Sequence, residues 1–118
     1  MNREKAKRLV ESAHEVGLQA GKSVECQTMV VAGGGKGYIV PDGPCGFAYV
    51  NIKPANSNVA KAMIEILGAR KSDYYGGVLL SVHEFNQSVT RKGAYARAFA
   101  KVLLKSGVKK VYSWSRLD

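Results

Sequence analysis

The chain has 118 residues, a formal net charge of +9, and hydrophobic and charged fractions of 46% and 23% that are ordinary for a globular domain. This length suits a single domain, residues 1–118, with one core of its own. No apolar run approaches the roughly 20 residues that a membrane-spanning helix needs. The basic start of the chain is followed by no continuous apolar stretch, so we also expect no secretory signal.

The first expected element is a helix that begins after Asn2 and ends near Gly21. Apolar residues recur in it at spacings of three and four and form one stripe: Ala6, Leu9, Val10, Ala13, Val16, Gly17 and Ala20. Because small residues dominate this stripe, it buries little area by itself. A second copy of the chain would complete that burial, so the stripe favours a homo-oligomer.

Short strands are expected on both sides of a glycine-rich run. Residues 27–31 and 38–40 are apolar and partly β-branched, and the glycine-rich run at 33–37 breaks the chain between them. The segment 46–53 alternates and has large side chains on both faces, which is typical of a central strand. Since the sequence Asp-Gly-Pro at 42–44 favours a turn, we predict a hairpin between 38–40 and 46–53.

The second half of the chain alternates helices and strands. A helix capped by Asn56 or Ser57 runs to about Leu67, and Gly68 ends it. Three further elements follow: a strand at 76–85, a long helix at about 88–106 and a last strand at 108–114.

This order of elements predicts an α+β fold. We expect a two-layer sandwich in which about three helices pack on a mixed sheet of four to five strands. If the strands at 46–53, 76–83 and 108–114 are parallel neighbours, their crossover connections should be right-handed. The patterns do not determine the order of the strands.

The positive charge is concentrated in the last third of the chain. Residues 85–118 contain eight Lys or Arg side chains and a single acid, Asp118, a difference of +7. The eight cations are Arg91, Lys92, Arg97, Lys101, Lys105, Lys109, Lys110 and Arg116. Such asymmetry is typical of proteins with an anionic partner.

The helix at 88–106 separates an apolar face from a basic face. A solvated outer face explains most helices of this kind, but no Glu or Asp balances the cations at i,i+4 spacing. Arg91 and Lys92 also lie in the first turn, where the helix dipole disfavours a cation unless an anion docks there. Gln87 and Ser88 would add hydrogen bonds to the same anion.

Aromatic residues stand beside some of the cations. Two clusters show this pattern: Arg70, Lys71, Tyr74 and Tyr75, and then Tyr112, Trp114 and Arg116. An aromatic ring beside a cation can stack on a base while the cation holds its phosphate, although core packing explains Tyr112 and Trp114 equally well. The predicted ligand-binding set is Arg70, Lys71, Tyr74, Tyr75, Gln87, Ser88, Arg91, Lys92, Arg97, Lys101 and Arg116.

The glycine-rich run does not fit a known phosphate-binding motif. A Walker motif needs a Gly six residues before the Lys and a Ser or Thr after it, but Val30 and Gly37 occupy those places. The dinucleotide-binding spacing fails because Tyr38 stands where the third Gly should be. We therefore interpret the run as a flexible hairpin tip.

Catalytic and metal chemistry have little support in the sequence. Cys45 and His83, with Asn86 or Gln87, are the residue types of a thiol hydrolase, but Cys45 enters a strand and not a helix N-terminus, where reactive thiols often lie. A buried structural Cys45 is favoured, so we expect no catalytic residue. Cys26 and Cys45 have no zinc-ligand spacing, and we expect no metal, no cofactor and a reducing cytoplasm.

Four stretches resemble a known group of proteins. They are DGPCGFAYVNIKPANS, YYGGV, QSVTRKGAYARAFAKVL and the terminal SRLD, spread over roughly residues 38–118. They are similar to a group of small uncharacterised proteins encoded by tailed bacteriophages, although the glycine-rich run departs from the group, in which that connection is longer. The resemblance implies no activity. It implies an accessory protein that acts in the cytoplasm of an infected bacterium.

Three functions follow from these observations. The first is non-catalytic binding of a phosphate-bearing ligand, either nucleic acid or a small nucleotide signal, through a basic carboxyl-terminal surface. The alternative is an inhibitor or adaptor that binds an acidic host protein, and the second alternative is a thiol-dependent enzyme that uses Cys45 and His83. The first function requires the carboxyl-terminal cations to gather on one surface of the folded chain.

Overall fold

The structure is a computed structural model that describes residues 1–24, 29–33, 36–40 and 44–118. The described helices are α1 (Arg3–Ser23), α2 (Asn58–Leu67) and α3 (Val89–Lys105). The described strands are β1 (Met29–Gly33), β2 (Lys36–Val40), β3 (Gly46–Ile52), β4 (Arg70–Lys71), β5 (Val78–Ser81) and β6 (Val111–Leu117). In the described part of the chain, every helix is too short or too polar to cross a membrane.

The α+β fold is confirmed, with three helices on a four-stranded sheet. The sheet has the order β4-β5-β3-β6, and every pairing among the described strands is antiparallel, so the sheet is not mixed and the strands at 46–53, 76–83 and 108–114 are not parallel neighbours. Along the chain the elements run β3-α2-β4-β5-α3-β6, which is the strand–helix–strand–strand–helix–strand order of ferredoxin-like domains. β1 and β2 form a separate two-stranded sheet.

The predicted hairpin between 38–40 and 46–53 is wrong. β2 pairs with β1 instead, from Met29 opposite Val40 to Gly33 opposite Lys36. β3 has no free edge for β2, because β6 pairs along its whole length, β5 pairs with Tyr49–Ile52 on the other edge, and the backbone of Val82 and Gln87 bonds to Ala48 and Gly46 there. Residues 27, 28 and 41–43, which include most of the predicted turn, lie outside the described residues.

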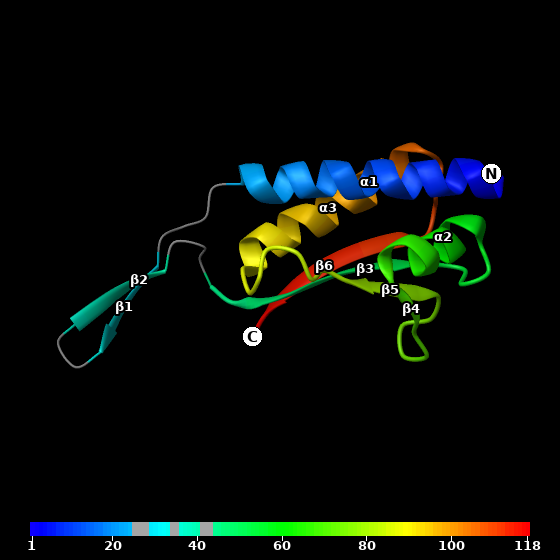
Figure 1. The fold of residues 1–118 in the computed structure, drawn as a ribbon. Coiled ribbons are helices and arrows are strands. Elements are labelled where there is room, and N and C mark those ends of the chain that lie inside the picture. The colour runs from blue at the N-terminus through cyan, green and yellow to red at the C-terminus, as the bar shows by residue number, and fades with distance from the viewer. Residues whose placement is uncertain (25–28, 34–35, 41–43) are drawn as a thin grey trace.

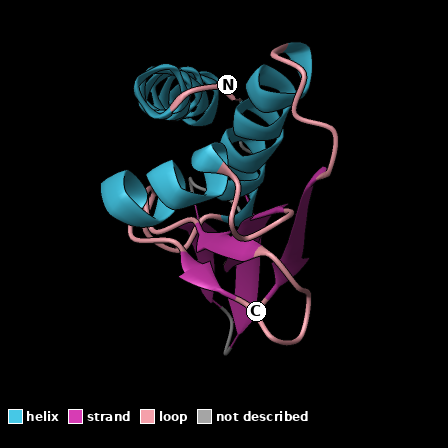
Figure 2. Ribbon diagram, turned by 90° about the vertical axis from the view of Figure 1, so that its right-hand side faces the viewer, coloured by secondary structure: helices cyan, strands magenta, loops and turns pink. Residues whose placement is uncertain are grey.

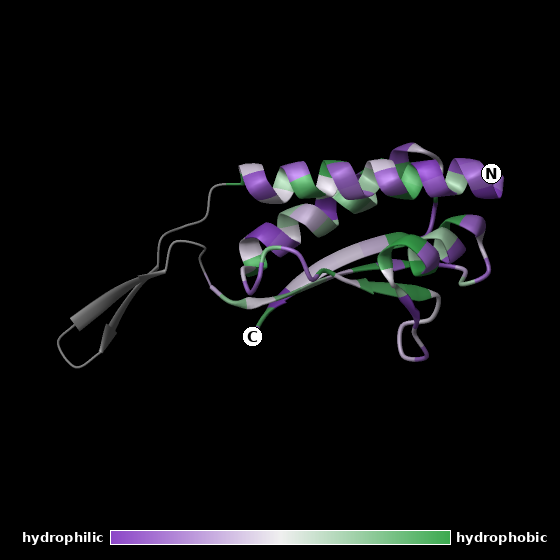
Figure 3. Cartoon of the chain, viewed as in Figure 1, coloured by the Kyte–Doolittle hydropathy of each residue, from purple (hydrophilic) through white to green (hydrophobic). Residues whose placement is uncertain are grey.

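The three helices lie on one side of the four-stranded sheet, and Figure 2 shows no helix on the other side. α2 and α3 contact the strands, while α1 packs across α3 and α2 (Figure 1). Apolar residues of α2 and β5 meet at the sheet (Figure 3). The largest fully buried side chains of the described residues are Tyr95, Phe99, Ile52, Met63, Leu103, Val10, Val50 and Val78.

The ends of the helices follow the sequence signals closely. The side chain of Asn2 accepts a hydrogen bond from the Lys5 backbone N–H, and that of Ser57 accepts one from Ala60. Gly68 ends α2 with a left-handed φ of +70°, as expected. α1 continues two residues beyond Gly21, however, so Gly21 does not end the helix.

Most of the small-residue stripe of α1 is buried within one chain, although Val16 is 44% exposed. Ala6, Val10 and Ala13 are 0% exposed, and Gly17 lies against the ring of Tyr95 in α3. The part of the stripe formed by Ala6, Val10, Ala13 and Gly17 is therefore covered by α2 and α3, and the homo-oligomer stays a prediction.

Polar contacts also connect the helices. Arg3 and Lys7 of α1 form ion pairs of 3.2 and 3.3 Å with Glu65 of α2, and together they hold the pKa of that carboxyl below its usual value. The Tyr95 hydroxyl lies within hydrogen-bond distance of His14 Nδ1. Burial raises the pKa of Tyr95 well above its usual value, because the ionised ring would lose its water.

Candidate functional site

β3 presents different residues to the two faces of the sheet. Its helix-facing side chains are at most 1% exposed: Ala48, Val50 and Ile52. Because side chains alternate along a strand, Phe47, Tyr49 and Asn51 belong to the opposite face. No described helix covers that face (Figure 2), which we call the open face.

β6 adds further aromatic side chains to the open face. Residues directly opposite one another in an antiparallel pair lie on the same face, and these pairs are Phe47 with Arg116, Tyr49 with Trp114, and Asn51 with Tyr112. The ring centroids of Tyr49 and Trp114 are 5.6 Å apart, and Tyr75 lies 4.9 Å from Trp114 on the other side. Three rings in contact therefore form a row on the open face.

The turn at residues 72–77 holds Tyr75 in this row. Asn51 is only 3% exposed, and its amide donates hydrogen bonds to the carbonyls of Gly76 and Val78 at 2.9 and 3.1 Å. Gly77 has a φ of +64°, and a Cβ there would lie 2.1 Å from the Ile52 carbonyl oxygen, so only glycine fits. These contacts fix the turn against β3 and place the Tyr75 ring beside Trp114.

Cations lie at both ends of the row. At one end, the Arg116 guanidinium and the Lys92 ammonium lie 5.4 and 5.9 Å from the centroid of the Phe47 ring. At the other end, Lys53 Nζ lies 5.7 Å from the centroid of Tyr112. All three distances are within the range of cation–π attraction.

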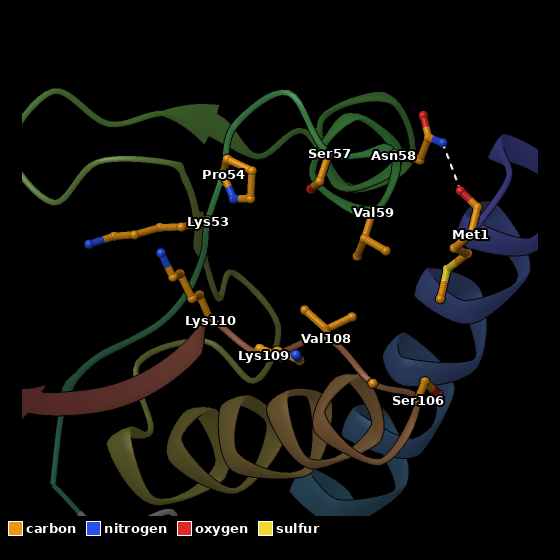
Figure 4. Close-up of a pocket in the computed structure, with 11 residues that line it drawn as sticks. Met1, Lys53, Pro54, Ser57, Asn58, Val59, Ser106, Val108, Lys109 and Lys110 are labelled. Atoms are coloured by element: carbon orange, nitrogen blue, oxygen red, sulfur yellow. Dashed lines mark hydrogen bonds between the residues drawn. The ribbon is translucent and has the colours of Figure 1, made fainter.

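Lys110 adds a fourth cation near Lys53. Its carbonyl accepts a hydrogen bond from the Lys53 backbone N–H at 3.0 Å, and Figure 4 shows the two side chains extending to the same side. Both side chains point away from a hollow of about 620 Å³ that lies between α2 and the connection from α3 to β6. Val59 and Val108 point toward the centre of this hollow. The hollow is therefore apolar at its centre, and the charges of Lys53 and Lys110 lie toward the open face.

These cations have no acidic partner in the described part of the chain. The ion pairs between described residues are those of Arg3 and Lys7 with Glu65, far from the open face. The row of rings is partly accessible, because Tyr75 is 43% exposed and Tyr49 and Trp114 are half-buried, and Tyr112 beside it is 49% exposed. Accessible aromatic side chains beside cations make this face the candidate binding site.

The structure brings together some of the residues predicted to bind a ligand. Tyr75 and Arg116 lie on the open face, Tyr74 stacks edge-on against Tyr75, and Lys92 reaches Phe47. Gln87 lines a hollow beside Lys92.

Other predicted residues lie elsewhere or have structural contacts. Arg97 and Lys101 are exposed on α3, which is on the helix side of the sheet. Arg91 donates to the carbonyls of Gly21 and Lys22 at the end of α1, and Ser88 is the buried cap of α3. Arg70 and Lys71 form β4 at the edge of the sheet and line a separate hollow with His83.

Cys45 is exposed, so the prediction of a buried cysteine is wrong. It lies just before β3 and forms an isolated antiparallel β-bridge with Ser88, the residue that caps α3. Among the described residues, no group of three His, Cys, Asp or Glu side chains could hold a metal ion.

Phe47, Tyr49 and Lys53 were missed by the sequence analysis. The signal was present, because 46–53 was recognised as having large side chains on both faces. It was interpreted as a central strand, which is confirmed because β3 lies between β5 and β6. A central position does not reveal that one face of the sheet carries no described helix.

No family model, no curated protein and no solved structure matches the chain. The resemblance to small phage proteins therefore stays a prediction.

Proposed function

We propose that the open face binds single-stranded nucleic acid, without catalysis. The observation that supports this most directly is the row formed by Tyr49, Trp114 and Tyr75, with unneutralised cations at both ends. Bases stack on accessible aromatic rings with about 1–3 kcal/mol per base, while nearby cations hold the phosphates. Stacking of this kind needs unpaired bases, so a single strand fits the face better than a duplex.

The size of the face favours a strand over a mononucleotide. The cations at Phe47 and those near Asn51 are separated by four residues of β3, roughly 13 Å at the usual rise per residue. Three contacting rings lie between them and offer stacking surfaces for more than one base. A short oligonucleotide is thus the preferred ligand, and a single nucleotide should bind more weakly.

We propose further that the protein is a phage-encoded accessory protein that acts in the cytoplasm of an infected bacterium. This part rests on the resemblance of residues 38–118 to small phage proteins. Binding and covering a single strand requires no catalytic group.

Trp114 provides a direct test, because it is the only tryptophan of the chain. Adding a short oligothymidylate should quench its fluorescence as a base stacks on the ring. Replacing Trp114→Ala should weaken binding of a labelled oligothymidylate, measured by fluorescence anisotropy, by about 5- to 150-fold.

Leu104→Ala is the matched control, since Leu104 is a large exposed residue of α3 on the helix side of the sheet. It should bind as the wild type does. The proposal would be overturned if the wild type neither binds nor is quenched at low salt, or if both variants bind alike. Equally tight binding of polyglutamate would instead support the acidic host protein as the partner.

A further inference from the structure

A hollow of about 520 Å³ opens at the Phe47 end of the open face. Its walls come from β3, the end of β5, the following loop and α3. The lining residues that matter here are Phe47, Tyr49, His83, Gln87 and Lys92.

Lys92 reaches this hollow from the other side of the sheet. It belongs to α3, and as a residue it is only 6% exposed, yet its ammonium lies over the ring of Phe47, which belongs to the open face. β5 pairs with β3 only from Tyr49 to Ile52, which leaves a gap beside Phe47 through which the Lys92 side chain reaches the hollow. The stem of Lys92 is therefore buried while its charged end faces the hollow.

The Lys92 charge is not neutralised by the protein. Within the described residues, no carboxylate forms an ion pair with it and no group hydrogen-bonds its ammonium. No described side-chain nitrogen is both buried and without a hydrogen-bond partner, so the Lys92 ammonium is open to the hollow. Since only the Phe47 ring lies near this charge, an anion that enters the hollow would complete the site.

We propose that this hollow is a phosphate subsite, in which Lys92 binds a phosphate group of the nucleic acid on the open face. Arg116, which lies over the same Phe47 ring, is placed to contact the same or the adjacent phosphate. The Gln87 side chain lines the hollow and supplies a neutral donor. This inference rests on the proposed function and adds where the strand is anchored.

The test is Lys92→Met, which removes the charge and keeps an unbranched apolar stem. Oligothymidylate affinity should fall by about tenfold, and the slope of log affinity against log salt should become shallower by about 0.7, as expected when one phosphate contact is lost. Thermal unfolding should occur at nearly the same temperature, because the buried apolar stem is kept and the lost charge is one that faces the hollow. A purely structural role of Lys92 would lower the unfolding temperature and leave the salt slope unchanged.

Two variants complete the comparison. Lys92→Arg keeps the charge and should restore most of the affinity. Lys105→Met removes an exposed cation at the far end of α3 and should leave both affinity and salt slope unchanged.

Oligonucleotides with and without a terminal phosphate distinguish the two sources of the group. If Lys92→Met abolishes a preference for a phosphorylated end, the subsite holds a terminal phosphate. If there is no such preference but Lys92→Met still weakens binding, it holds an internal one.

The inference is overturned if the wild type binds oligothymidylate and Lys92→Met binds it with the same affinity and salt slope. Absence of binding by the wild type would overturn the proposed function as well, so the two failures are distinguishable.

Discussion

Arg91 and Lys92 are neighbours in the first turn of α3, but they have different roles in the structure. Both were predicted to face one anion, because the helix dipole disfavours cations there. Successive helical residues point about 100° apart, so Arg91 turns toward α1 and Lys92 toward the sheet. The sequence shows the charge but not the direction in which each side chain leaves the helix.

Arg91 is expected to contribute to stability and not to ligand binding. Its guanidinium donates to the Gly21 and Lys22 carbonyls at 2.8 and 3.1 Å, which satisfies acceptors at the end of α1 that lack helical partners. Arg91→Gln should lower the free energy of unfolding by about 1–2 kcal/mol in urea denaturation. Oligonucleotide affinity of the folded variant should stay near the wild-type value.

The control for this prediction is Arg97→Gln, since Arg97 is exposed on the same helix. It should unfold at the wild-type urea concentration. A selective loss of binding by Arg91→Gln, with unchanged stability, would return Arg91 to the ligand site and contradict its structural role.

The candidate site could be predicted only in part at the level of residues. Tyr75 and Arg116 were identified because an aromatic residue and a cation stand close together in the sequence. Phe47 and Tyr49 could not be identified in this way, since the cations over Phe47 come from α3 and β6 and the ring beside Tyr49 comes from β6. Only the folded sheet brings these side chains together.

At the level of elements, local sequence signals predicted most helices and strands. They could not predict which strands pair when the partners are far apart in the sequence. Caps at Asn2, Ser57 and Ser88 begin helices where expected. β5 is shorter than the predicted 76–85, because the chain takes left-handed φ values at Gly76 and Gly77 and again at Phe85. The strand pairing was wrong because β3 pairs with β6, which follows it only after two helices and two strands.

Gly21 is expected to be essential for the packing of α1. A Cβ at this position would lie 2.3 Å from the Phe85 ring and 3.1 Å from the Arg91 carbonyl oxygen. Gly→Ala normally stabilises the interior of a helix by about 1 kcal/mol, but here we expect Gly21→Ala to destabilise the protein by about 1–3 kcal/mol through overpacking. Thermal or urea unfolding shows whether Gly21→Ala lowers or raises the stability of the protein.

Gly93 of α3 supplies the matched control. Its added Cβ would meet the end of the flexible Arg97 side chain at 3.2 Å, which can move away. Gly93→Ala should therefore leave stability unchanged or raise it. If Gly21→Ala were also stabilising, α1 would not lie as close to Phe85 and Arg91 as described.

For the whole molecule, the positive charge is divided between the two sides of the sheet. Arg97, Lys101 and Lys105 are exposed on α3, while Lys53, Lys92, Lys110 and Arg116 lie at or near the open face. The carboxyl-terminal cations do not gather on one surface as the sequence analysis required. The net charge of +9 attracts an anion from any direction, but only the open face combines cations with a row of rings.

This division of charge predicts a moderate salt dependence of binding. Each phosphate contact on a single strand contributes about 0.7 to the slope of log affinity against log salt. Contacts from the four cations of the open face give a slope of about −3, whereas all eight carboxyl-terminal cations would give about −6. Anisotropy titrations with oligothymidylate over a range of salt concentrations measure the slope.

Replacing Lys101→Met should leave this slope unchanged, and Arg116→Met should make it shallower by about 0.7. A wild-type slope near −6, made shallower by Lys101→Met, would show that the strand also contacts α3 and would remove the open face as the sole binding surface.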